Sequence, residues 1–215
     1  MTHEDEGFKN VENPKEKTHN LVREKYAEIA KEEAGGCMPS CCDGSSPLVT
    51  IMDIGKALDY SKEDLLFSPG KANLGLGCGN PISRAGLKAG EIVLDLGSGA
   101  GFDAFLAAKR VGESGKVVGV DMTPEMIHKA RANAEELNIS NVDFRLGEIE
   151  RLPVDDNAAD VVISNCVINL SPDKSAVFRE IYRSLKPGGR MVISDVLRCG
   201  EIPEELSDNP AAYTG

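Results

Sequence analysis

The chain has 215 residues, of which 35 are Asp or Glu and 24 are Lys or Arg, so its formal net charge is -11, and 41% of its residues are hydrophobic. This balance excludes a nucleic-acid-binding protein, because contact with phosphates needs a basic surface. We find no apolar run long enough to span a bilayer and no signal sequence at the amino terminus. We therefore expect a cytoplasmic protein without membrane contacts, with six cysteines that serve as reduced thiols, metal ligands or catalytic groups.

Residues 1–90 are predicted to form a cap of helices and cysteine-bearing loops. Residues 15–34 place four apolar side chains on one face of a helix: Val22, Tyr26, Ile29 and Ala30. The turn-rich segment 35–44 predicts a loop or mobile lid that carries Cys37, Cys41 and Cys42. Further on, Ser61-Lys-Glu-Asp64 resembles a capping box at the start of a short helix. Residues 70–79 form a second glycine-rich loop, which contains Cys78.

Residues 91–200 are predicted to form an α/β core, because strand and helix patterns alternate there. The expected strands are 92–96, 117–121, 142–146, 160–164 and 190–194, and the expected helices are 102–111, 124–137 and 173–185. Such alternation specifies a parallel sheet with right-handed crossovers. Lys186-Pro-Gly-Gly189 is predicted to end the last helix and turn into the fifth strand. That strand would lie near a sheet edge, so we expect residues 201–215 to begin a C-terminal region of a longer protein.

The segment 93–101, Val-Leu-Asp-Leu-Gly-Ser-Gly-Ala-Gly, is predicted to be a nucleotide-binding turn between a buried strand and a helix. Its glycines permit positive φ angles and a close approach of the ligand to the backbone. The NAD fingerprint matches only loosely, from Gly99 to Ala104. Asp95, which precedes the glycines, favours a ligand with an ammonium or hydroxyl group, and S-adenosylmethionine has both an amino-acid end and a ribose.

Two further strand ends support this interpretation. Asp121 is placed to bind ribose hydroxyls and Met122 to pack on adenine, while Glu148, Ile149 and Glu150 follow the third strand. The alternative is that Asp121 caps the helix beginning at Pro124 and that both glutamates are solvated. Together the marks predict a class I methyltransferase core that binds S-adenosylmethionine. The expected cofactor-binding residues are Asp95, Gly97, Ser98, Gly99, Gly101, Asp121, Met122, Glu148, Ile149, Glu150 and Asn165, the last of which either binds the methionine end or caps a turn.

From about Val22 onward the chain resembles the arsenite S-adenosylmethionine methyltransferases. The resemblance rests on four motifs: Asn73-Leu-Gly-Leu-Gly-Cys-Gly-Asn-Pro81, Leu94-Asp-Leu-Gly-Ser-Gly-Ala-Gly101, Gly119-Val-Asp-Met-Thr123 and Ser164-Asn-Cys-Val-Ile-Asn-Leu170. The first and last, which contain cysteine, are far more specific than the glycine motif. The resemblance implies a Rossmann-like fold and transfer of a methyl group to thiolate-bound As(III).

The resemblance also implies roles for individual cysteines. Cys78 and Cys166 match two of three cysteines that hold arsenic, and the third belongs to a C-terminal segment, since Cys199 does not match its place. Cys41 or Cys42 would form a redox disulfide with Cys78, with a thiol reductant of the glutathione or thioredoxin type as co-substrate. Cys37 would assist substrate capture. We accordingly expect this 215-residue form to bind the donor but to methylate arsenite poorly.

The chemistry of Cys78 and Cys166 agrees with these roles. Both are expected at the crevice that holds the donor, and two thiolates there make a soft site for trivalent arsenic. The alternative is that each cysteine is merely buried packing. No histidine lies in a motif, and we expect His3, His19 and His128 to be surface or helical residues.

Three other functions compete with arsenite methylation. The first is a class I methyltransferase acting on carbon or oxygen of a small metabolite such as a quinone precursor, which would not need Cys78 or Cys166. The second is a non-enzymatic thiol module that binds zinc or arsenite, although the C-x3-C-C spacing is not that of structural zinc sites. The third is an NAD oxidoreductase. In every case we favour a monomer.

Overall fold

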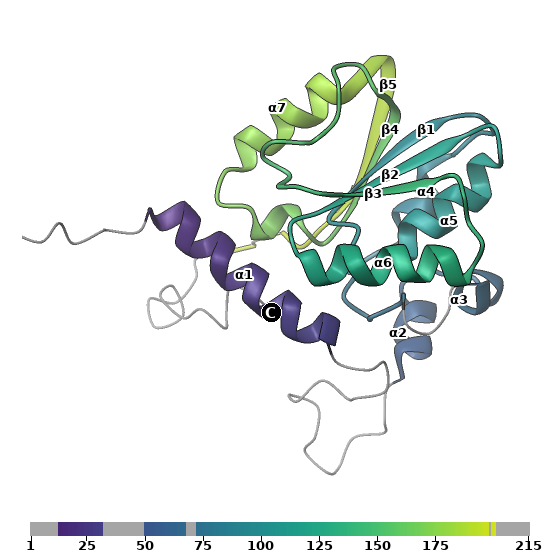
Figure 1. Ribbon diagram of the computed structural model, residues 1–215, viewed down its shortest axis with the longest axis horizontal. Coiled ribbons are helices and arrows are strands. Elements are labelled where there is room, and N and C mark those ends of the chain that lie inside the picture. The colour runs from purple at the N-terminus through teal and green to yellow at the C-terminus, as the bar shows by residue number, and fades with distance from the viewer. Residues whose placement is uncertain (1–12, 32–49, 68–71, 198, 201–215) are drawn as a thin grey trace, which may run out of the picture.

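The computed structural model describes residues 13–31, 50–67, 72–197 and 199–200 (Figure 1). Cys37, Cys41 and Cys42, the predicted loop 35–44 and residues 201–215 lie outside the described residues. None of the helices in the described ranges is both long and apolar enough to cross a membrane.

The core is a parallel sheet of five strands in the order β3-β2-β1-β4-β5. The strands are β1 (Ile92–Leu96), β2 (Lys116–Asp121), β3 (Val142–Leu146), β4 (Ala159–Asn165) and β5 (Leu185–Ser194). The predicted alternation of strands and helices is therefore confirmed. Since all five strands are parallel, their carboxyl ends meet at one edge, where open α/β sheets bind ligands.

Helices cover both faces of this sheet because successive strand residues point in opposite directions (Figure 1). Val93 belongs to the core cluster shared with α4 (Pro81–Ala85), α5 (Phe102–Val111) and α6 (Pro124–Glu136). Leu94 belongs to the cluster on the opposite face, together with Val177 and Ile181 of α7 (Lys174–Ser184). A short 3-10 helix, η2 (Ile168–Leu170), follows β4. The central strands β1, β2 and β4 are buried on both faces, which explains why they are mostly apolar, whereas the edge strands β3 and β5 carry more polar residues.

The start of β5 differs from the prediction. The strand follows α7 directly, and Leu185 pairs with Ala159 while Arg190 pairs with Val161. The predicted turn, residues 186–189, is thus an irregularity inside the strand, with Gly188 at a φ of 82°. The Lys186 ammonium lies 2.8 Å from the Asp160 carboxylate, which holds this irregularity against β4.

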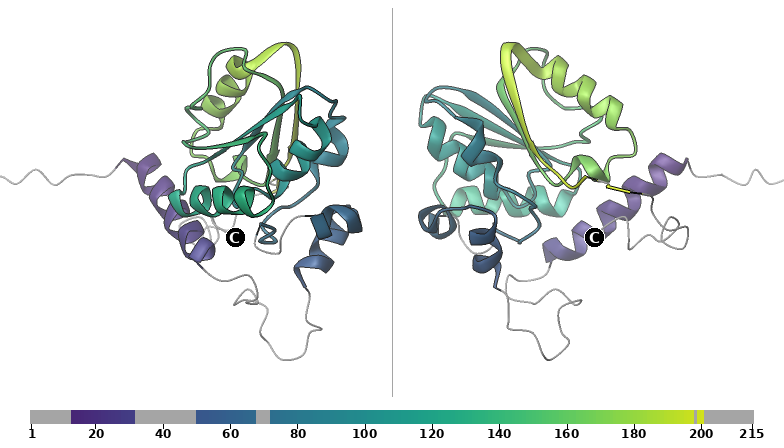
Figure 2. Two further views of the ribbon diagram at one scale, coloured as in Figure 1. Left: turned by 45° about the vertical axis from the view of Figure 1, so that its right-hand side comes forward. Right: turned by 180° about the vertical axis from the view of Figure 1, so that it is seen from behind.

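Three helices precede the sheet: α1 (Pro14–Lys31), α2 (Ile51–Ala57) and α3 (Lys62–Phe67). Helix α1 lies beside α6 in every view (Figures 1 and 2), and its predicted apolar face is confirmed, with Val22 and Ala30 buried. Ser61 accepts a hydrogen bond from the Asp64 amide, as expected of a cap. The Asp64 carboxylate, however, binds Arg110 of α5 at 3.1 Å, so the reciprocal half of the predicted capping box is replaced by a tertiary ion pair.

Candidate active site

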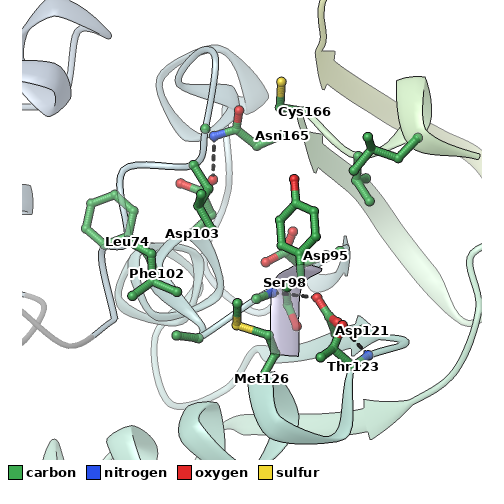
Figure 3. A pocket seen from close by; sticks show the side chains of 18 of the residues that line it. Leu74, Asp95, Ser98, Phe102, Asp103, Asp121, Thr123, Met126, Asn165 and Cys166 are labelled. Atoms are coloured by element: carbon green, nitrogen blue, oxygen red, sulfur yellow. Dashed lines mark hydrogen bonds between the residues drawn. The ribbon is translucent and has the colours of Figure 1, made fainter. Parts of the chain in front are cut away.

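A pocket opens at the carboxyl ends of β1, β2 and β4, between the glycine loop and α1 (Figure 3). Of the expected cofactor-binding residues, all but Glu148 and Gly101 line it. Gly101 nevertheless belongs to the glycine loop, where it is the N-cap of α5. The pocket therefore gathers most of the residues predicted from separate strand ends.

The glycine loop has the backbone conformation that its sequence predicts. Gly97, Gly99 and Gly101 have φ angles of 66°, 52° and 96°, a region that other L-residues rarely adopt. A Cβ at Gly97 would lie 2.5 Å from a methyl carbon of Val167, whereas a Cβ at Gly99 would meet nothing within 4 Å. Gly97 thus allows a close packing contact, while Gly99 leaves its side of the loop open.

This difference predicts unequal costs for two alanine substitutions. Gly99→Ala carries only the left-handed strain and should lower the free energy of unfolding by about 1 kcal/mol. Gly97→Ala adds overpacking against Val167 and should cost about 2–4 kcal/mol in total. Chemical denaturation of both variants measures the difference, and equal costs would contradict the described packing of Gly97.

Asp95 is a buried carboxylate with an unused acceptor. Asp95 is only 3% exposed, and its Oδ2 atom has no hydrogen-bond partner among the described residues. Burial, and then the nearby carboxylates of Asp103 and Asp121, raise its pKa well above the ordinary value. The Ser98 hydroxyl is also buried without a partner in the described part of the chain. Unpaired buried polar atoms are costly, so their presence in a pocket indicates a ligand that pairs with them.

Asp121 connects the end of β2 to the glycine loop. One carboxylate oxygen accepts the Gly99 amide at 2.9 Å and the other accepts the Thr123 amide at 2.8 Å. The alternative that Asp121 is the helix cap is wrong, since the N-cap of α6 is Thr123. Burial raises the pKa of Asp121, although its backbone hydrogen bonds oppose that shift. The residue therefore fixes the loop and also faces the pocket.

The segment after β3 is partly different from the prediction. Ile149 and Glu150 line the pocket, but the Glu148 carboxylate instead pairs with Arg23 at 3.3 Å and with His19 at 3.5 Å. The other ring nitrogen of His19 lies 3.1 Å from Glu150, which also accepts a hydrogen bond from Ser171. Neither glutamate is thus merely solvated. His19 is a helical residue, as expected, and the structure adds that it lines the pocket and contacts Glu150.

Sequence reasoning missed the contribution of α1 to the site. His19, Val22 and Tyr26 all line the pocket. Burial, and then the nearby Cys166 and Asp121, raise the pKa of Tyr26 to about 12. The apolar face of the helix signalled that α1 packs on something, but helical periodicity does not identify the partner. Residues of α5 and α6, such as Phe102, Asp103 and Met126, were missed for the same reason (Figure 3).

The two cysteines singled out from the sequence lie together beside the pocket. Cys166 lines the pocket directly after β4, and Cys78 follows Gly77, which also lines it. Burial raises the pKa of the Cys166 thiol, and the neighbouring Cys78 thiol adds to the shift. Both cysteines are free and partly buried. Two neighbouring thiols can bind one soft ion together.

Cys166 also has a strained backbone. Its φ is 59°, and its amide donates to the Ser194 carbonyl at 2.8 Å. A left-handed conformation at a residue other than glycine costs about 1–3 kcal/mol and persists only where its surroundings enforce it. In Figure 3 the Cys166 thiol lies at the edge of the drawn residues and points away from Asp95, Ser98 and Asp121. Cys199, by contrast, is exposed.

Asn165 binds the protein more extensively than the sequence indicated. Its Oδ1 accepts the Cys78 amide at 3.0 Å. Its Nδ2 lies 2.9 Å from both the Gly79 carbonyl and the Asp103 carboxylate, and 3.1 Å from the Tyr60 hydroxyl. Asn165 also lines the pocket, and its role at the methionine end of the donor stays a prediction.

Known proteins with similar sequences come from several organisms. The arsenite methyltransferase of Halobacterium salinarum is 49% identical over 205 residues, which are 93% of this chain and 52% of that protein. The arsenite methyltransferase of Aquipseudomonas alcaligenes is 38% identical over 208 residues, with coverage of 91% and 55%. The chain thus spans about half the length of the curated relatives it matches.

Solved structures agree with the fold. An arsenic(III) S-adenosylmethionine methyltransferase from Chlamydomonas reinhardtii is similar with a TM-score of 0.57 and 44% identity, covering 74% of this chain and 54% of that one. A SAM-dependent methyltransferase from Aquifex aeolicus has a TM-score of 0.53 and 28% identity, covering 72% and 79%. Residues 87–215, more than half of the chain, match the family model described as a methyltransferase domain. The chain therefore belongs to the methyltransferase domain family and has the Rossmann-like fold of a class I methyltransferase.

Proposed function

We propose that this chain is the donor-binding and thiol-bearing part of an arsenite methyltransferase, which transfers a methyl group from S-adenosylmethionine to thiolate-bound As(III). The observation that carries the proposal is the pair of free thiols, Cys78 and Cys166, beside a pocket lined by buried carboxylates. The names of the relatives from Halobacterium salinarum and Aquipseudomonas alcaligenes support the same function.

The residues of the pocket fit S-adenosylmethionine. Asp95, Asp103 and Asp121 are buried together, and burial raises the pKa of each. Such a group of carboxylates favours a cationic ligand and disfavours the anionic pyrophosphate of NAD. The free acceptor on Asp95 suits the donor's ammonium or a hydroxyl group, and Ser98 offers a further polar contact. Asp121 and Met122 would hold the ribose and adenine, as the sequence predicts.

The chemistry divides between the donor pocket and the thiol pair. When bound, S-adenosylmethionine supplies an electrophilic methyl group on a sulfonium. Cys78 and Cys166 bind arsenous acid by replacing two hydroxyl groups, and each thiol proton leaves with a hydroxyl as water. Because the proton leaves in this way, a raised thiol pKa does not prevent binding. Arsenic held by thiolates retains a lone pair and is the nucleophile, so the protein needs no general base. Rate then comes from positioning and from exclusion of water by α1.

Other parts of the proposal rest on the resemblance alone. We propose that a third thiolate comes from a segment other than the described residues, and that Cys41 or Cys42 forms the redox disulfide with Cys78. A thiol reductant of the glutathione or thioredoxin type would restore the reduced form. We also propose that the protein is a cytoplasmic monomer.

The proposal is tested by incubating the chain with arsenite, S-adenosylmethionine and glutathione and then separating the arsenic species. We expect methylated arsenic, in small amounts, and calorimetric binding of S-adenosylmethionine but not of NAD. A binding isotherm for NAD and none for S-adenosylmethionine would overturn the donor assignment. Donor binding without two-thiol binding of arsenite would instead favour a methyltransferase acting on carbon or oxygen.

A further inference from the structure

Asn165 connects the two segments of the chain that carry the Cys78 and Cys166 thiols. It is the last residue of β4 and immediately precedes Cys166. Its carboxamide oxygen accepts the amide of Cys78 at 3.0 Å, although 87 residues separate the two positions in the chain. One side chain therefore ties the backbone of one cysteine to the strand that ends at the other.

The carboxamide is itself held in place from the opposite side. Its two N–H groups have three acceptors within reach: the Gly79 carbonyl, the Asp103 carboxylate and the Tyr60 hydroxyl. The Tyr60 hydroxyl in turn donates to Asp103 at 2.7 Å. Both donors of the amide group are thus used within the protein, so they are not free to bind a ligand.

The loop that carries Cys78 needs such an anchor. Cys78 lies between α3 and α4, in a glycine-rich segment that belongs to no helix or strand, whereas Cys166 directly follows the end of β4. Gly77 packs so closely on Asn165 that a Cβ there would lie 2.6 Å from Nδ2. The residues on both sides of Cys78, Gly77 and Gly79, thus contact the Asn165 carboxamide.

We propose that Asn165 is a positioning residue that sets the spacing of the Cys78 and Cys166 thiols for joint binding of As(III). This inference rests on the proposed function for the identity of the acceptor. It replaces the expectation that Asn165 binds the methionine end of the donor, because the hydrogen bonds of the side chain are directed to the thiol loop and α5.

Phenylarsine oxide tests the spacing without methyl transfer. It forms two As–S bonds with two thiols and releases its oxygen as water with both thiol protons. We expect Asn165→Ala to weaken its binding at least about 10-fold, in line with the loss of a buried hydrogen-bond partner, and to change the affinity for S-adenosylmethionine less than about 3-fold. The matched control is Asn141→Ala, since the Asn141 amide donates to two backbone carbonyls, at 3.1 and 2.9 Å, far from the thiols. It should leave both affinities unchanged.

A second variant keeps the test decisive if Asn165→Ala fails to fold. Gly77→Ala pushes a methyl group into the carboxamide and should also weaken binding of phenylarsine oxide. In the double variant that combines Gly77→Ala with Asn165→Ala, the smaller residue at 165 makes room for the new methyl group. The two losses of affinity for phenylarsine oxide should therefore be less than additive. Additive losses, or wild-type binding in both single variants, would overturn the positioning role.

The failure of this inference is distinguishable from failure of the proposed function. If wild-type protein binds phenylarsine oxide through Cys78 and Cys166 but never methylates arsenite, the proposed function fails while the spacing role stands. If arsenite is methylated and Asn165→Ala binds the probe normally, only the spacing role fails. A parallel loss of donor affinity in Asn165→Ala would show that the residue serves the donor pocket instead.

Discussion

Replacing either Cys166 or Cys78 with serine should abolish two-thiol binding of As(III) and lower methylation at least about 100-fold. A hydroxyl is a hard ligand and a poor substitute for a thiolate toward a soft ion, and a single remaining thiol loses the advantage of chelation. The pocket that we propose binds the donor is lined by Asp95, Asp121 and the glycine loop, so calorimetry should still detect binding of S-adenosylmethionine. Arsenic speciation and calorimetry on the same protein preparations measure both effects.

Cys199→Ser is the matched control for these two variants. Cys199 is exposed, and its thiol lies 3.6 Å from the Leu197 carbonyl. It should retain wild-type affinity for phenylarsine oxide and wild-type methylation. Full activity of Cys166→Ser would refute the acceptor site and favour a methyltransferase with a carbon or oxygen acceptor.

Asp95→Asn should stabilise the ligand-free protein while weakening the binding of S-adenosylmethionine. The substitution keeps the shape of the side chain and removes a buried charge that lies close to two other carboxylates. We expect the free energy of unfolding to rise by about 1 kcal/mol, which corresponds to about 2–4 °C in Tm for a chain of this size. Loss of a charge-assisted hydrogen bond should lower donor affinity about 10- to 100-fold.

The stabilisation should depend on pH in a defined direction. The pKa of Asp95 is higher in the folded protein than the ordinary value of 3.8, so the folded state binds the proton more tightly than the unfolded state. The loss of stability that the Asp95 carboxylate causes in wild type is therefore absent below about pH 3.8. It grows as the pH rises towards the folded pKa and is complete above that pKa. The Tm difference between Asp95→Asn and wild type should follow the same course.

Denaturation scans with and without S-adenosylmethionine check this prediction. Donor binding should raise the Tm of wild type more than that of Asp95→Asn at neutral pH. A ligand-free Asp95→Asn variant less stable than wild type at neutral pH would show that the carboxylate has a structural partner. Equal donor affinity in the two proteins would exclude Asp95 from the binding site.

Most of the sheet and of the candidate donor site could be predicted from local sequence. Continuous apolar runs predict parallel strands buried on both faces, and the glycine loop requires positive φ angles that few other residues adopt. Asp95 and Asp121 could be predicted to line one pocket because chain position alone puts them at the carboxyl ends of neighbouring strands. The beginning of β5 was less predictable, since Lys186 and the following glycines are compatible with either a turn or an irregular strand.

The contacts of α1 could not be predicted in this way. Periodicity shows that the face with Val22 and Tyr26 is buried, but only packing against α6 brings Tyr26 and His19 to the pocket. Glu148 lies only two residues before Glu150, yet its carboxylate pairs with Arg23 and does not line the pocket. Such pairings depend on which distant element covers a strand end.

By itself, the sequence determined a parallel α/β core, a glycine loop with acidic residues at two strand ends, and two cysteines in distinctive motifs. Only the tertiary structure decided that Asn165 joins the Cys78 loop to β4 and that a helix near the amino terminus covers the pocket. The physical reason is the range of the interactions. Backbone conformation and strand burial are encoded by neighbouring residues, whereas a hydrogen bond between positions 78 and 165 exists only after the sheet has brought them together.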